Sequence, residues 1–328
     1  MGIIRKRLEA RLQWWEIQKD AIRYFGLKLW IVKKLTAKVY PRNRKLGIWL
    51  NERKHEIILQ YIHKHYGSLI SLPEQPGLTN ITDDCPIWTC WWTGEDSAPE
   101  LVKACLRSIR KYAGNHEVIV ISWDNYQEYV DIPDAIIRRC REEKKILPAH
   151  VADLLRCKLL EKYGGIWCDA TIFMTAEHNK EMYEYPFFTI KHHLEYSQHL
   201  ELEPSKCYWR IFYMASCKGN PLVRITGNIL EQWMLSDTPL INYWTMDYIF
   251  LLIYRKNKWI KEMMDNVPYN NEHPYFLQNH INDVLTDEIL GILATQGIHK
   301  LSWKEVIKNS EDSVYQRVIK SEHIDSDI

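Results

Sequence analysis

The chain of 328 residues is 46% apolar and carries 43 Lys and Arg against 42 Asp and Glu, which gives a formal net charge of +1. This is enough apolar material for the core of one large domain with an appendage, or for two domains. No run of residues approaches the roughly 18 consecutive apolar positions of a membrane-spanning helix, so a membrane-spanning segment is not expected.

Cysteine usage and the first residues favour the cytoplasm. The eight cysteines are scattered and none forms a C-x-x-C pair, which fits a reducing compartment better than secretion. Charges at positions 5, 6, 7 and 9 break the first apolar stretch, so a signal peptide is not expected.

Residues 1–80 are predicted to form a basic, helical N-terminal segment. Within residues 1–56, 15 Lys and Arg stand against five acidic residues, which leaves the rest of the chain acidic. The apolar residues on one side of a helix there are Phe25, Leu29, Val32 and Val39. Aromatic residues, among them Trp14 and Trp15, lie between the charges. Such a segment could lie on an anionic membrane surface. The alternative is a helical hairpin packed on the rest of the chain with a solvated basic face, and nucleic-acid binding is not expected.

After a linker-like stretch from Pro73 to Asp84, strands and helices alternate. The predicted elements are a strand at 85–92, a helix from 97 to 112, a strand at 117–122, short helices near 125–130 and 134–144, a helix at 149–163 with a strand after it, strands at 187–190 and 209–216, and a helix from 220 to 235. This order predicts an α/β sheet with right-handed crossovers and a ligand crevice at the carboxyl ends of the strands. The apolar run at 117–122 is typical of a central strand covered on both faces. Ser97 and Glu100 have the spacing of a capping box.

Residues 149–174 (AHVADLLRCKLLEKYGGIWCDATIFM) are the most informative part of the chain. A helix ends at a glycine pair, and a short strand follows. Asp153 and Arg156 face the apolar side of the helix, where an ionised pair is costly unless it is hydrogen-bonded and used. Alternation along the strand places Asp169 and Thr171 on one face. We therefore expect Asp153, Arg156 and Asp169 to converge at one cleft.

A structural interpretation competes for each part of this pattern. A D-x-x-R pair on a helix is often an intrahelical salt bridge, and an aspartate after a Gly-Gly turn is often a turn residue. Because the combination within one helix–turn–strand unit is rarer than either part, we favour a functional site.

The pattern A-D-L-L-R-x-x-L-L-x-x-Y-G-G-I-W-x-D-A-T resembles glycosyltransferase family 32, the DXD sugar-binding transferases, and more closely their capsular polysaccharide synthesis branch. The large clostridial glucosylating toxins have a related core. The resemblance extends from about Cys85 to Lys304, with none before residue 80. It implies a GT-A-type fold, a Rossmann-like doubly wound sheet over residues 81–308, followed by a C-terminal tail at 309–328.

The resemblance also implies roles for the residues of the central unit. Asp153 and Arg156 would hold the hydroxyls of the donor sugar. Asp169 would reach a divalent metal, Mn²⁺ or Mg²⁺, and the ribose. Thr171 stands where the second Asp of the D-x-D motif is found, and a hydroxyl is a poorer ligand for these metals than a carboxylate. The metal would then be held through Asp169, water and the diphosphate.

Further candidate residues lie at strand ends and near residue 300. Trp92-Thr93-Gly94 resembles a W-x-G motif whose ring stacks on the nucleobase, and a core tryptophan is the alternative. The Lys, hydroxyl and indole groups of residues 300–304 suit a diphosphate leaving group, and a solvated edge strand is the alternative. The expected donor- and nucleotide-binding residues are Trp91, Trp92, Gly94, Asp124, Thr171, Lys300, Ser302, Trp303 and Lys304.

Two more candidates concern the acceptor and the metal. Asp247, in an apolar and aromatic stretch, is either an acceptor-side group or a helix-start residue next to the cap Thr245. His299 is a further candidate metal ligand, although no spacing typical of a zinc site supports it.

The resemblance implies a bacterial hexosyltransferase that acts in capsular or surface polysaccharide synthesis. It would pass a sugar from a nucleotide-diphosphate sugar to a carbohydrate or lipid-linked oligosaccharide, with retention of configuration, in the cytoplasm or at the inner face of the cell membrane. A sugar-phosphate transferase and a non-catalytic carbohydrate-binding scaffold, with Thr171 marking a lost site, are the alternatives. The sequence has no P-loop, no G-x-S-x-G elbow and no internal repeat.

Overall fold

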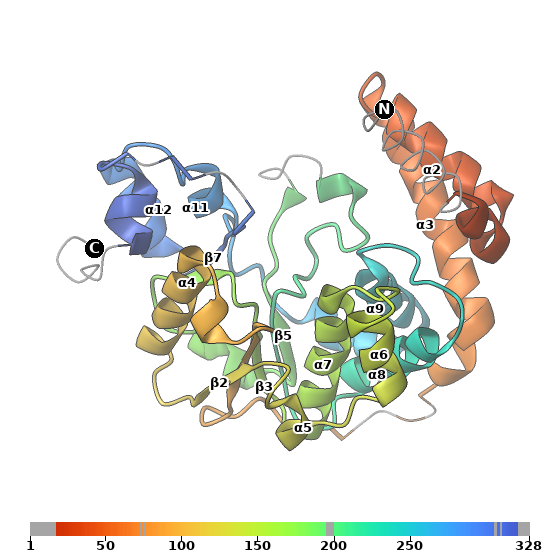
Figure 1. The fold of residues 1–328 in the computed structure, drawn as a ribbon, viewed down its shortest axis with the longest axis horizontal. Helices are drawn as coiled ribbons and strands as arrows, with labels where there is room; N and C mark the ends of the chain where they lie inside the picture. The colour runs from red at the N-terminus through yellow and green to blue at the C-terminus, as the bar shows by residue number, and fades with distance from the viewer. Residues whose placement is uncertain are drawn as a thin grey trace, which may run out of the picture.

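The computed structural model describes residues 18–72, 74, 77–194, 200–304, 307–308 and 310–320 (Figure 1). Trp14 and Trp15, the charges at positions 5–9 and Pro73 lie outside the described residues. So does most of the predicted tail beyond residue 320.

A five-stranded mixed sheet forms the centre of the fold. Its strands, in spatial order, are β2 (Val118–Ile121), β1 (Ile87–Cys90), β3 (Gly165–Cys168), β6 (Tyr213–Ser216) and β5 (Phe187–Thr189). β1 is parallel to both β2 and β3, whereas β6 is antiparallel to β3 and β5. A separate antiparallel pair consists of β4 (Ile172–Met174) and β7 (Ile298–Lys300). The predicted α/β class is confirmed, and the GT-A assignment stays a prediction.

The strand at 117–122 was expected at the centre of the sheet, and this prediction is wrong. β2 lies at one end of the strand order, and Val118, Ile119 and Val120 are only partly buried. β3, β6 and β5 all lie on the side of β1 opposite to β2, so β2 has a single neighbouring strand. An apolar run fits an edge strand here because Ile119 packs against the core on one face of the sheet, and Val118 and Val120 pack against the core on the other.

Helices cover both faces of the sheet (Figure 1). The helices that follow β1 in the chain are α4 (Glu100–Lys111), α5 (Tyr126–Tyr129), α6 (Asp134–Arg141), α7 (Pro148–Lys162), α8 (Pro221–Leu235), α9 (Thr245–Lys256), α10 (Lys258–Asp265), α11 (Phe276–Asn279), α12 (Asp287–Thr295) and the π-helical turn Tyr315–Lys320. Trp88 and Trp167 belong to the core shared with α7, α8 and α9. Their strand neighbours Ile87 and Ile166 belong to the core under α4. Successive strand residues thus face opposite layers, which buries the sheet on both sides.

Two helix starts test the predicted capping residues. α8 begins at Pro221 with the Asn220 side chain accepting a hydrogen bond from the Leu222 N–H at 3.0 Å, as predicted. The capping box at Ser97 is wrong, because α4 starts only at Glu100 after Pro99. The Ser97 hydroxyl instead donates to the carbonyl oxygen of Thr93 at 2.8 Å and closes a short turn.

Two helices precede the sheet, α2 (Leu27–Val39) and α3 (Arg44–Tyr66). They pack against each other, and α3 packs against α9. The stripe predicted for membrane contact faces this packing, since Leu29 is buried and the Phe25 ring meets the Tyr61 ring at 5.1 Å. α3 shares its core with α7–α9. Within the described part of the chain, no helix has both the length and the apolar character needed to cross a bilayer.

The glycine pair after α7 sets the path of the chain into β3. Gly164 and Gly165 have φ of 74° and 108°, a region that side chains other than glycine rarely adopt. The Gly164 carbonyl oxygen accepts a hydrogen bond from the Trp88 indole at 2.9 Å. A methyl group on Gly165 would lie 2.4 Å from the Pro86 carbonyl oxygen. β3 can therefore approach β1 only with glycine at this position.

We expect Gly165→Ala to lower the free energy of unfolding by about 2–5 kcal/mol, because a backbone penalty and a steric clash add. Gly114→Ala is the matched control: φ is +60° there, but a methyl group would meet nothing within 4 Å. It should cost only about 1–2 kcal/mol. Chemical denaturation of both variants checks this, and equal losses would contradict the role of the clash.

Candidate active site

A cluster of two acidic and two basic side chains lies at the carboxyl end of β3. Asp153 and Arg156 come from α7, Asp169 from the turn between β3 and β4, and Lys300 from β7. Arg156 contacts an Asp169 oxygen at 3.2 Å and an Asp153 oxygen at 3.5 Å. Lys300 Nζ lies 2.7 Å from the other Asp169 oxygen. The structure thus brings Asp153, Arg156 and Asp169 together as the sequence pattern predicts, and their chemical roles stay predictions.

Arg156 is held in place by backbone and ring contacts. Its guanidinium carbon lies 4.7 Å from the centre of the Trp167 ring, and one of its terminal nitrogens donates to the Ile211 carbonyl oxygen at 2.7 Å. The residue is only 4% exposed. A planar cation so fixed presents its remaining donors in a set direction, toward Asp153 and Asp169.

Asp169 is the electrostatic centre of the cluster. Burial by itself would raise the pKa of its carboxyl, but the Lys300 and Arg156 cations and the Trp167 indole outweigh burial and hold the pKa below its usual value. The indole donates to Asp169 Oδ1 at 2.8 Å. Asp169 is therefore ionised at neutral pH and accepts hydrogen bonds at both oxygens.

Thr171 joins the cluster through Lys300. Its hydroxyl oxygen lies 2.7 Å from Lys300 Nζ, so one ammonium group bridges Asp169 and Thr171. The pairing of β4 with β7 places Lys300 opposite Ile172. Lys300, which was expected to bind phosphate, is therefore hydrogen-bonded to Asp169 and Thr171, the first and third residues of the D-x-T motif.

This contact bears on whether a divalent metal fits. No group of three or more His, Cys, Asp and Glu side chains that could hold a metal ion occurs among the described residues. Asp169 already accepts from Arg156, Trp167 and Lys300, and Thr171 contributes a neutral oxygen. Mn²⁺ and Mg²⁺ prefer several oxygen ligands with negative charge. As arranged, the donor set does not fit a directly held metal.

His299 does not belong to this cluster. It is fully buried, its Nε2 lies 3.1 Å from the Thr175 hydroxyl, and burial lowers its pKa to about 3. Adjacent residues of β7 point to opposite sides, so Lys300 reaches Asp169 and His299 does not.

The predicted base-binding tryptophans lie after β1. The Trp92 ring stacks on the Trp123 ring at 3.8 Å and donates its indole N–H to the Pro148 carbonyl oxygen at 2.8 Å. Trp123 was not singled out from the sequence, although its position two residues after β2 could have indicated it. Trp91 meets the Trp303 ring edge-on at 5.8 Å, and its indole nitrogen is buried without a hydrogen-bond partner.

The other expected donor-binding residues are more exposed. Asp124 and Lys304 are exposed, and Ser302 is half-buried. Gly94 has φ of 80° in the turn after Trp92. The neighbouring Asn125 side chain accepts from the Ser122 N–H and fixes the turn after β2. Among the described residues, none of these side chains forms a hydrogen bond or ion pair with the Asp169 cluster.

Asp247 lies in the first turn of α9, but it does not cap the helix. Its carboxylate is 7% exposed and accepts from the Trp209 indole at 2.9 Å. Burial, together with the nearby Glu203 carboxylate, raises the pKa of Asp247 to about 7. An acceptor-side role stays a prediction.

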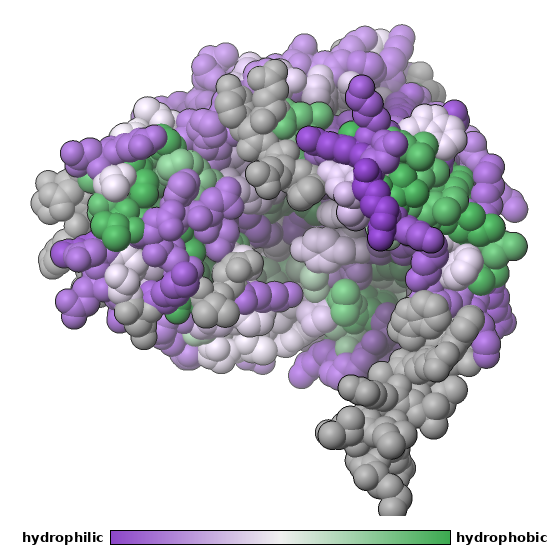
Figure 2. All heavy atoms as spheres, turned by 90° about the horizontal axis from the view of Figure 1, so that it is seen from above, coloured by the Kyte–Doolittle hydropathy of each residue, from purple (hydrophilic) through white to green (hydrophobic). Residues whose placement is uncertain are grey.

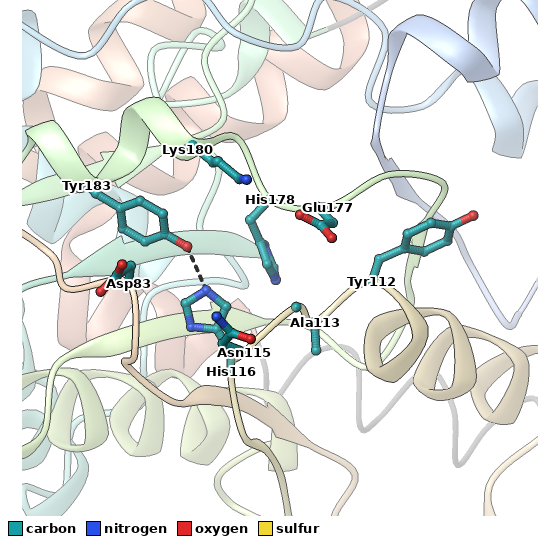
Figure 3. A pocket seen from close by; sticks show the side chains of 10 residues that line it. Asp83, Tyr112, Ala113, Asn115, His116, Glu177, His178, Lys180 and Tyr183 are labelled. Atoms are coloured by element: carbon teal, nitrogen blue, oxygen red, sulfur yellow. Dashed lines mark hydrogen bonds between the residues drawn. The ribbon is translucent and has the colours of Figure 1, made fainter.

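A separate cavity of about 380 Å³ lies elsewhere (Figure 3). In it, His116 pairs with the Cys85 carbonyl oxygen and the Tyr183 hydroxyl at 2.7 and 2.6 Å. None of the site residues predicted from the sequence lines it. His116 and Cys85 precede β2 and β1, so the cavity is at the amino ends of strands whose carboxyl ends face the Asp169 cluster. We take the Asp169 cluster as the candidate active site.

A protein-family model described as capsular polysaccharide synthesis protein matches residues 39–318. The chain belongs to this family. The capsular polysaccharide resemblance seen in the central unit is thus confirmed, whereas the wider family 32 assignment stays a prediction. The expectation of no resemblance before residue 80 is wrong, because the match begins at the last residue of α2 and includes all of α3.

A structure entitled "PaToxG Glycosyltransferase" is similar at 12% identity and a TM-score of 0.38, over 66% of this chain and 83% of that chain. No curated protein gives a significant match.

The raised pKa of Asp247 predicts a pH dependence of stability. Between about pH 4 and 7 the folded state keeps a proton on Asp247 that the unfolded state, with a pKa of 3.8, has lost. Stability from this group therefore falls as pH rises through that window. Asp247→Asn removes the effect and can still accept from Trp209.

We expect the free energy of unfolding of the Asp247→Asn variant, minus that of the unsubstituted protein, to be larger at pH 8 than at pH 5. Denaturant unfolding of both proteins at the two pH values measures it, and titrating groups that do not interact with Asp247 cancel in the difference. A difference that does not change with pH would contradict the raised pKa.

Proposed function

We propose that this member of the capsular polysaccharide synthesis family is a glycosyltransferase. It moves a sugar from a nucleotide-diphosphate sugar to a carbohydrate or lipid-linked oligosaccharide in surface polysaccharide synthesis. The observation that carries the proposal is the cluster of Asp153, Arg156, Asp169 and Lys300, which meets at the carboxyl end of a parallel strand. Ligands of open α/β sheets bind outside such strand ends.

The cluster has the groups that a charged sugar donor needs. Asp153 and Arg156 offer an acceptor and several donors to sugar hydroxyls. Asp169 accepts from hydroxyls of the sugar or ribose. Lys300 supplies positive charge for the diphosphate, with Ser302, Trp303 and Lys304 as further donors.

The surrounding aromatic groups and acids complete the proposed substrate site. The Trp92–Trp123 stack gives a flat apolar surface for the base, with Trp91, Gly94 and Asp124 beside it in sequence. Asp247 is the acceptor-side group.

In the proposed reaction the bond between the anomeric carbon and the diphosphate oxygen breaks, and its electron pair stays on the diphosphate. A new bond forms from an acceptor hydroxyl oxygen on the same face, and the hydroxyl proton passes to the leaving diphosphate. The transition state has oxocarbenium character, so no strong protein base is needed. The chain orients the donor, stabilises the departing diphosphate and excludes water.

The central test is transfer by the purified protein with a panel of nucleotide-diphosphate sugars. We expect at least one donor to raise the melting temperature and to release free nucleotide. Asp169→Asn should lower turnover by about 100-fold or more, because it removes the charge that orders Arg156 and Lys300. Asp287→Asn, an exposed acid in the first turn of α12, is the control and should keep full turnover.

The products distinguish the alternatives. A glycosidic bond supports the proposal, and a phosphodiester would indicate a sugar-phosphate transferase. Binding of saccharides without any donor turnover would indicate a carbohydrate-binding scaffold. Near-normal turnover by Asp169→Asn would remove Asp169 from the mechanism.

We also propose that the exposed face of α2 rests on the anionic inner surface of the cell membrane. Leu27, Ile31 and Leu35, spaced four residues apart, are 54%, 41% and 43% exposed. α2 has four lysines and no acidic residue. Hydrophobic residues gather on the right side of the molecule in Figure 2, the side on which α2 and α3 lie in Figure 1. An apolar stripe with flanking lysines suits anionic lipid headgroups. The stripe lies on the side opposite to the one predicted from the sequence.

Vesicle co-sedimentation tests this surface. We expect the protein to bind phosphatidylglycerol-containing vesicles at low salt more tightly than purely zwitterionic ones. The double substitution Ile31→Glu and Leu35→Glu should weaken binding by about tenfold or more. Leu235→Glu, at an equally exposed leucine on α8 (40%), is the control. Equal binding by both variants would contradict the proposal.

A further inference from the structure

We propose that the Lys300 ammonium takes the place of a divalent cation between Asp169 and Thr171, so that the chain binds its nucleotide-diphosphate donor without a metal. This inference rests on the proposed function and assigns the charge that neutralises the diphosphate. Its basis is the bridge from Lys300 Nζ to Asp169 Oδ2 and Thr171 Oγ1, both at 2.7 Å.

The backbone delivers Lys300 to this point. β7 pairs antiparallel with β4, which starts one residue after Thr171. The pairing extends beyond the strand, since the Leu301 N–H donates to the Thr171 carbonyl oxygen at 2.9 Å. The Lys300 N–H also donates to the Pro274 carbonyl oxygen at 2.6 Å. The ammonium position therefore follows from strand register, in addition to the reach of a long side chain.

The two oxygens of Asp169 leave little room for a metal. Oδ1 accepts from the Trp167 indole at 2.8 Å and from Arg156 at 3.2 Å, and Oδ2 accepts from Lys300. A divalent ion bound at Asp169 and Thr171 would lie next to the ammonium, and like charges at such distances repel strongly. One carboxylate and one hydroxyl cannot offset that repulsion.

Lys300 keeps a donor for the substrate. An ammonium has three N–H groups, and Asp169 and Thr171 account for two of them. The Lys300 side chain is 22% exposed, so the third N–H can reach a phosphate oxygen at the rim of the cluster. Asp169 and Thr171 thus orient the ammonium, and the ammonium meets the diphosphate as a point charge.

Isothermal titration with UDP, GDP, ADP and dTDP tests the inference, in EDTA and again in Mg²⁺. We expect at least one nucleoside diphosphate to bind the unsubstituted protein with dissociation constants within threefold in the two buffers. Lys300→Met should weaken that binding by tenfold or more in EDTA. Lys308→Met, at an exposed lysine, should bind like the unsubstituted protein, and thermal unfolding checks that each variant is folded.

The outcomes separate this inference from the proposed function. A dissociation constant more than tenfold higher in EDTA than in Mg²⁺ overturns the inference and leaves the glycosyltransferase proposal in place. Binding by a folded Lys300→Met variant as tight as that of the unsubstituted protein also overturns it. The comparison of the two buffers needs no variant. No binding of any nucleoside diphosphate in either buffer overturns both proposals.

Discussion

The site depends on a single carboxylate that burial alone would disfavour in its charged form. Asp169 stays ionised because a guanidinium, an ammonium and an indole N–H surround it. These partners come from α7, β3 and β7. The cluster therefore ties the adjoining α7 and β3 to a strand whose Lys300 lies 131 residues beyond Asp169. Removing one partner from such a buried cluster leaves an uncompensated charge. The stability of the fold and the proposed activity therefore depend on the same cluster.

The backbone around the cluster determines where the side chains of Asp169 and Arg156 lie. The glycine pair lets β3 approach β1 closely, and four strand residues then bring the chain to Asp169. α7 packs on the same side of the sheet as Trp167, which brings Arg156 over the indole ring. The family match at 39–318 covers all of these elements, and α3 and β7 as well. The region that the family model matches is thus larger than the central motif.

The sequence predicted what depends on local order and not what depends on distant pairing. Helical periodicity and the glycine pair located α7 and β3, and the inward Asp153 and Arg156 indicated the cluster. The edge position of β2 and the antiparallel β6 follow from strand order, for which local patterns carry no signal. Lys300 was expected near phosphate. Its hydrogen bond to Asp169 requires the pairing of β4 with β7, which brings together two residues that are 131 positions apart in the sequence.

That pairing has a consequence for how the protein is made. Synthesis proceeds from the N-terminus and domains fold as their residues emerge, so the segment with Asp169 leaves the ribosome long before β7 does. Until Lys300 arrives, the carboxylate has Arg156 as its single cationic partner in the cluster. A nascent or prematurely terminated chain would hold the central sheet but lack the last charge of the site. Assembly of the complete cluster is thereby tied to synthesis of the chain as far as Lys300.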